Sequence, residues 1–238
     1  MRNDKNAMST PRRVLTQRVL RTPRAAAIAG IFFALLLGLA YILIRVAIPP
    51  NLLDEGIWLE ERSGMVTVAL SLVPFAGIAF LWFMGVVRDR LGHLEDQFFS
   101  TVFYGSGLLF LAMTFVSAAM AGGIVGSYAV ESTKLIESGV YTYSRAVMYR
   151  ISNVYAIRMA GVFMISLGTI WIRTQVMPRL LAFLTYALAL VLLVTISYSL
   201  WVTLIFPGWV LVISAYILVL NLRRLGAGTD VAPGAIEA

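Results

Sequence analysis

Apolar blocks as long as a lipid bilayer is thick recur along this chain, and they constrain its fold more than any other feature. Residues 101–130 and 180–220 contain no charged side chain. A helix needs roughly 20 apolar residues to cross the hydrocarbon core, because the core is ~30 Å thick and each residue rises ~1.5 Å. Charged residues make up 13% of the 238 positions, against about 25% in a soluble domain. The blocks do not alternate as barrel strands do, and lipid satisfies no open backbone group, so the sequence predicts an all-α integral membrane protein.

Charged residues, prolines and glycines divide the apolar sequence into a bundle of about six predicted transmembrane helices. A membrane domain at residues 25–224 lies between a basic tail at residues 1–24 and a flexible tail at residues 225–238. We place the spans at about residues 25–46, 65–87, 101–130, 155–173, 179–200 and 203–222. The last apolar block must turn, since as one helix it would extend ~61 Å. Pro207-Gly208 is its strongest break signal, and residues 197–199 are the alternative.

The basic residues predict that both termini lie inside. Seven of the 19 lysines and arginines precede the first span. With this orientation the inside segments carry 13 basic residues and the outside loops carry four, as the positive-inside rule requires. The net charge of +7 therefore indicates contact with anionic lipid rather than nucleic acid. We expect a bacterial cytoplasmic (inner) membrane.

The rare residue types exclude several kinds of chemistry. The chain has no cysteine and one histidine, His93, which removes thiolate metal sites, iron–sulfur clusters and bis-histidine haem ligation. Asp89, Glu95 and Asp96 surround this histidine, but their spacing matches no established metal site. We find no catalytic residues and expect no metal and no cofactor, so the sequence favours a non-enzymatic role.

Intramembrane charge is the usual sign of a functional site, and here it is confined to two arginines near the predicted outer surface. Arg45 ends the first span and Arg158 begins the fourth. Either could bind an anion or lipid head group, or pair with the acidic first loop or with Glu131 or Glu137 in the tyrosine-rich loop predicted at residues 131–157. From about Ser144 onward, we expect this loop to belong already to the fourth helix. The alternative is that both only extend to the membrane surface. A groove that joins these arginines to the loop's tyrosines would favour a lipid or anion site.

Small residues recur every fourth position in two of the spans. They are Gly30, Ala34 and Gly38 in the first span and Gly122 and Gly126 in the third. Such ridges let helix backbones approach closely where no hydrophobic effect drives association. We interpret them as packing within one bundle, with a dimer interface as the alternative. On this reading a leucine at position 122 disturbs assembly more than truncation of a lipid-facing Leu111.

The loop after the second span resembles the cytoplasmic loop motif of the major facilitator superfamily. Gly85, Asp89, Arg90 and Gly92 match that motif over nine residues, and the loop falls between spans 2 and 3 on the inside, as in that family. The resemblance implies a transporter whose loop charges hold neighbouring helices together during alternating access. His93 and Leu94 replace the family's basic pair, and this chain has half of the family's twelve spans. The alternative is a tight, charged turn that faces the inside.

These observations leave two main hypotheses for function. The first is a non-enzymatic membrane component that acts through contacts with membrane lipids, with another membrane protein or with a second copy of itself. The second is a small channel or carrier subunit for an anion or small solute, as a single chain or an oligomer. A polar cavity between the spans would favour the second, and a solid bundle would favour the first.

Overall fold

The computed structural model describes residues 22–51, 54, 56–91, 97–175, 177–195 and 200–229. Within these ranges every regular element is a helix, as expected of an all-α protein. Five helical segments are long and apolar enough to cross a membrane: Ala25–Ala47, Ser63–Arg88, Phe98–Val130, Val140–Thr174 and Trp201–Arg223. The chain is therefore a multi-pass membrane protein. A sixth apolar helix, Arg179–Val194, has 16 residues and extends ~24 Å, less than a membrane thickness.

The elements follow one another with short connections. They are α1 (Thr22–Ala47), α2 (Ile57–Glu61), α3 (Ser63–Leu91), α4 (Gln97–Val130), α5 (Ser132–Glu137), α6 (Val140–Arg150), the π-helix η1 (Ile151–Ala156), α7 (Ile157–Thr174), α8 (Arg179–Val194), the 3-10 helix η2 (Leu200–Leu204) and α9 (Ile205–Thr229).

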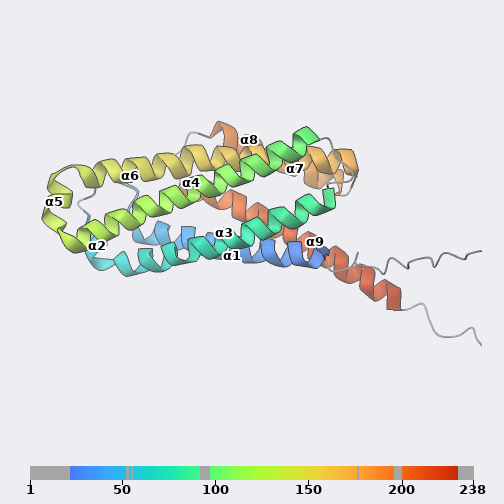
Figure 1. Cartoon of the computed structure of the whole chain (residues 1–238), viewed down its shortest axis with the longest axis horizontal. Coiled ribbons are helices and arrows are strands. Elements are labelled where there is room, and N and C mark those ends of the chain that lie inside the picture. Colours follow the sequence, from blue (N-terminus) through green and yellow to red (C-terminus); the bar gives the residue numbers. More distant parts are fainter. Residues whose placement is uncertain are drawn as a thin grey trace, which may run out of the picture.

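Two groups of helices make up the bundle. In the first, α1 packs between α3 and α9. In the second, α6, η1 and α7 form one continuous rod that packs on α4, and α8 covers α7. The groups meet where α3 contacts α4. Figure 1 shows α2 and α5 together at one end of the bundle, called here the α2/α5 end, and the end of α9 at the other.

The predicted fourth span, residues 155–173, lies within a helix that begins at Val140, four residues before the start near Ser144 that the sequence predicts for it. Residues 140–150 are too polar to read as a span, yet Tyr141, Arg145, Met148 and Tyr149 are all buried. Their spacing places them on one face of a helix, and that face packs against α4. Much of the loop predicted at residues 131–157 is therefore helical.

The break predicted at Pro207-Gly208 is wrong. Both residues lie inside α9, which begins at Ile205. Instead the chain leaves α8 at Thr195, whose backbone is extended. A proline in the first turn of a helix costs no hydrogen bond, because the first N–H groups have no partner within the helix. The alternative break at residues 197–199 lies outside the described residues, as do residues 1–21 and 230–238 of the two predicted tails.

Five phenylalanines fill the centre of the bundle. Phe33, Phe80, Phe110, Phe163 and Phe206 come from α1, α3, α4, α7 and α9, and each is at most 2% exposed. The ring of Phe80 lies 4.5–5.8 Å from the other four, between ring centroids. Aromatic pairs at such distances add to the energy of burial. This Phe cluster closes the space between the helices at its level.

The glycines that permit close helix contact are only partly those of the predicted ridges. A Cβ on Gly30 would clash with Ser214 and Phe83, which shows that α1 closely approaches α9 and α3 there. By contrast, a Cβ on Gly38 or Gly126 would meet open space. Ala34, one turn after Gly30 on α1, is buried. A Cβ on Gly122 would lie 3.7 Å from Leu70, which is an ordinary van der Waals contact.

Sequence spacing alone could not identify the other tight contacts. Added Cβ atoms would clash with Phe115 at Gly77 and with Met84 at Gly107. The expectation that Leu111 faces lipid is also wrong, since this side chain is 6% exposed and belongs to the main core. α4 is apolar on every side, so its sequence has no periodicity that separates a buried face from a lipid face.

Candidate functional site

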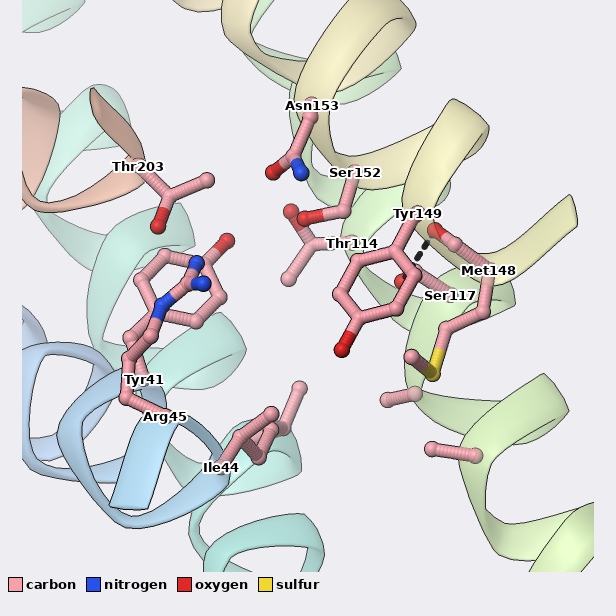
Figure 2. A pocket seen from close by; sticks show the side chains of 13 residues that line it. Tyr41, Ile44, Arg45, Thr114, Ser117, Met148, Tyr149, Ser152, Asn153 and Thr203 are labelled. Carbon is pink, nitrogen blue, oxygen red and sulfur yellow. Dashed lines mark hydrogen bonds between the residues drawn. The ribbon is translucent and has the colours of Figure 1, made fainter. Parts of the chain in front are cut away.

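A cavity lined by both apolar and polar side chains lies between α1, α3, α4, α6, η1 and η2 (Figure 2). Its volume is about 40 Å³, enough for roughly three water molecules. The cavity is lined by Tyr41, Ile44, Arg45, Val73, Thr114, Ser117, Ala118, Ala121, Met148, Tyr149, Ser152, Asn153 and Thr203. We call it the Arg45 cavity.

The helix spacing of α1 brings Arg45 into the cavity. Phe33, Leu37, Tyr41 and Arg45 follow one another at intervals of four residues and so share one face of the helix. The first two are fully buried in the core, which directs this face inward along its length. Figure 2 shows the guanidinium of Arg45 and the amide of Asn153 pointing into the same space.

Three residues around the cavity have buried polar atoms with no hydrogen-bond partner in the described part of the chain. These atoms are Nε and Nη1 of Arg45, the hydroxyl of Tyr149, and both amide atoms of Asn153. Tyr149 and Asn153 are 6% and 5% exposed. A buried polar group without a partner costs about 1–3 kcal/mol. Five such atoms around one cavity indicate that it holds water or a polar ligand.

The π-helix η1 places part of this polar surface. Ser152 and Asn153 lie in η1, directly after the last turn of α6 that carries Tyr149. A π-helical turn is wider than an α-helical turn and occurs often at functional sites. Across the cavity, the hydroxyl of Ser117 on α4 donates to the backbone carbonyl of Met148 at 3.1 Å and fixes α6 against α4.

The cavity favours a negatively charged guest. None of its lining residues is acidic, and Arg45 is its one charged side chain. The ion pairs found among the described residues, Arg145–Asp54 and Lys134–Glu131, do not include Arg45. A guanidinium with two free N–H groups, beside hydroxyl and amide donors, presents the hydrogen bonds that carboxylate and phosphate oxygens accept.

A second polar network lies next to the cavity at the α2/α5 end. The Arg145 side chain is fully buried and lies 3.5 Å from Oδ2 of Asp54. Its Nη1 donates to the Tyr141 hydroxyl at 3.1 Å and its Nη2 donates to the Pro49 carbonyl at 2.7 Å. Tyr141 in turn accepts from Nε1 of Trp58 at 2.7 Å and donates to Asp54 at 3.0 Å. These bonds join the segment between α1 and α2 to α6.

Tyr149 connects this network to the cavity. The guanidinium carbon of Arg145 lies 5.8 Å from the centre of the Tyr149 ring, within the range of a cation–π contact. Tyr149 also lines the Arg45 cavity. The two arginines therefore differ in one respect that matters for binding: Asp54 balances the charge of Arg145, and no acidic residue lines the cavity around Arg45.

The structure separates the four charged residues that the sequence offers as a site. Arg45 lines the cavity, whereas Arg158 donates at 3.4 Å to two backbone carbonyls, one on its own rod and one at the end of α8. Glu131 pairs with Lys134, and Glu137 is exposed on α5. The possible pairing of Arg158 with either glutamate is not formed.

The motif after the second span is only partly described. Asp89 and Arg90 lie in the last turn of α3, and Gly92 belongs to residues 92–96, which are outside the described ranges.

Sequence reasoning missed the polar residues of the rod, although a signal for them exists. Tyr141, Arg145, Tyr149 and Asn153 follow one another at intervals of four residues. This spacing places a polar stripe along one helix face once the helix is known to begin at Val140. With the helix expected to start only near Ser144, Tyr141 falls outside it and the stripe is incomplete.

Comparisons with known proteins assign no role to this cavity. No protein-family model, no curated protein and no solved structure matches the chain.

Proposed function

We propose that this multi-pass membrane protein binds a small anionic group, a carboxylate or a phosphate, in the Arg45 cavity. Its role is that of a non-enzymatic membrane component that holds an anionic lipid or small anionic ligand. The observation that carries the proposal is the half-buried guanidinium of Arg45, whose buried Nε and Nη1 have no partner among the described residues.

The energetics support an anion over water alone. A cation removed from water is costly unless it is paired and hydrogen-bonded. The planar guanidinium matches the two oxygens of a carboxylate or phosphate through parallel N–H···O bonds. Asn153 and Tyr149 add donors from the opposite wall. One such group fits the volume of about 40 Å³ and satisfies several of the unpaired atoms together.

A cavity with polar groups between the spans also fits the hypothesis of a channel or carrier, but the packing around it gives that hypothesis less support. Thr114 lines the cavity and its hydroxyl donates at 2.9 Å to the carbonyl of Phe110, one turn earlier on α4. Phe110 belongs to the Phe cluster. Packed aromatic rings one helical turn from the cavity favour binding over conduction.

The position of the site relates it to the membrane surface. With both termini inside, as the distribution of basic residues predicts, the α2/α5 end faces outward and Arg45 lies near the outer surface. Such a site is within reach of lipid head groups as well as of dissolved anions. We propose a bacterial inner membrane as the location and membrane lipids as the immediate partners.

Calorimetric titration of the full chain in nanodiscs of zwitterionic lipid tests the proposal. The ligands are inorganic phosphate and acetate, and the variants are Arg45→Gln and Arg150→Gln. Arg150 is exposed on α6 and does not line the cavity. The Arg150→Gln variant is therefore a control that loses one positive charge without changing the cavity. We expect Arg45→Gln to weaken binding at least tenfold, because a hydrogen bond to a charged group contributes about 1.5–3 kcal/mol. Arg150→Gln should bind as the parent does.

Two results would contradict the proposal. One is a parent protein that binds neither anion, and the other is an Arg45→Gln variant that binds them as tightly as the parent.

A further inference from the structure

The lining of the Arg45 cavity has two chemically different sides. Polar groups occupy one side, where Arg45, Asn153 and Ser152 lie near Thr203 and Thr114 (Figure 2). Much of the remaining lining is apolar and consists of Ile44, Val73, Ala118, Ala121 and Met148, of which Figure 2 shows Ile44 and Met148 away from Asn153 and Thr203. A site for a fully hydrated or purely inorganic anion has no need of such a wall, because apolar surface offers an anion no hydrogen bond.

The apolar side continues beyond the cavity. Val73 packs with Ala40 and Ala69 in a small buried cluster between α1 and α3, and Ile44 and Ala118 pack against that cluster. Alanines at positions 118 and 121 of α4 leave room that larger side chains would fill. The cavity thus borders a seam of purely apolar contacts where α1, α3 and α4 meet.

We infer that the ligand is amphipathic: an anionic carboxylate or phosphate head with an alkyl chain attached. This inference rests on the proposed function and specifies its ligand class. The head lies against Arg45 and Asn153, and the first carbons of the chain lie against Ile44, Val73 and Ala118. The cavity has space for about three water-sized groups, so the head occupies most of it and the first carbons of the chain meet the apolar lining.

Short water-soluble ligands separate the contribution of the chain from that of the head. Butyl phosphate is compared with inorganic phosphate, and butyrate with acetate, in titrations of the full chain in zwitterionic nanodiscs. Each fully buried methylene adds about fourfold to affinity. We therefore expect the butyl ligands to bind at least tenfold more tightly than their parents. Butylammonium, which has the same chain and the opposite charge, should not bind.

A matched pair of variants locates the chain. Ala118 lines the cavity, whereas its neighbour Ala119 is exposed on α4 and does not. Ala118→Met fills the apolar side and should abolish the advantage of butyl phosphate while phosphate affinity changes by less than about threefold. Ala119→Met should keep that advantage. Arg45→Gln should weaken butyl phosphate and phosphate alike.

The outcomes distinguish this inference from the proposed function. If phosphate binds through Arg45 and butyl phosphate binds no better, the ligand is a free anion and the amphipathic inference is wrong while the proposed function stands. If neither ligand binds, the proposed function fails. If Ala118→Met keeps the full advantage of the butyl chain, the chain lies elsewhere and the inference is overturned.

Discussion

The buried Arg145–Asp54 pair offers the sharpest test of what holds the α2/α5 end together. The perturbation is a double-mutant cycle of Arg145→Met and Asp54→Asn. Methionine keeps much of the volume of arginine and removes its charge, whereas asparagine keeps an acceptor for Tyr141 and Gly56 and removes the negative charge. Arg145 is fully buried, and the side chain of Asp54 is 14% exposed.

The geometry sets the expected magnitude. At the observed 3.5 Å, an effective dielectric constant of about 20 gives a gross attraction of about 5 kcal/mol. Desolvation offsets much of it, so the net contribution is smaller, but loss of one partner leaves the other without compensation. We expect Arg145→Met to lower the free energy of unfolding by about 3 kcal/mol. The coupling energy between the two changes should be about 1–3 kcal/mol. The double variant should therefore lose less stability than the two single losses added together.

The assay is equilibrium unfolding in mixed SDS and neutral detergent micelles, followed by tryptophan fluorescence. Trp58 reports on this end directly because it donates to Tyr141. Arg150→Met is the control, since it removes an exposed arginine from the same helix. The reasoning is refuted if Arg145→Met is as stable as Arg150→Met, or if the effects of Arg145→Met and Asp54→Asn are simply additive.

Two further predictions concern helix packing and use the same unfolding assay. Gly30→Leu should prevent assembly or lower the free energy of unfolding by more than about 3 kcal/mol, because an added Cβ already meets Ser214 and Phe83. Gly38→Leu, whose added Cβ meets open space, should be near neutral. Equal losses of stability in the two variants would contradict the close contact of α1 with α3 and α9 at Gly30. Leu111→Ala should lower the free energy of unfolding by about 2–5 kcal/mol because the side chain is buried, whereas Gly122→Leu should lower it by less than about 1 kcal/mol. The reverse order would support the packing role that the sequence spacing predicts for Gly122.

The sequence predicts the helical class well because long uncharged blocks leave a chain few other options in lipid. It predicts helix limits less well where a polar residue is buried by a partner rather than exposed to water. The polar residues around Tyr141 place the expected helix start near Ser144, yet the helix begins at Val140. Tyr141 and Arg145 are both buried in it through bonds to Asp54, Trp58 and the Pro49 carbonyl. Those partners lie more than 80 positions away in sequence, so no local pattern contains them.

The candidate site shows the same division. Arg45 can be recognised from sequence because charge within or at the edge of the apolar spans is the usual sign of a site, and few residues here qualify. The sequence does not show that Arg45 faces inward while Arg158 bonds to backbone carbonyls, because both stand at the edge of a span. Tyr149 and Asn153 become site residues only when η1 continues α6 and presents them to α1. Tertiary contact, not residue type, decides these roles.

An experimental density map of the full chain in lipid nanodiscs, prepared with butyl phosphate, tests the central claim most directly. We predict a phosphate-shaped density in the Arg45 cavity, within hydrogen-bond distance of the Arg45 guanidinium and the Asn153 amide, with chain density toward Ala118. The same map from the Arg45→Gln variant should lack it. A cavity that contains only water in the parent, with the Arg45 guanidinium turned out to the membrane surface, would contradict the account.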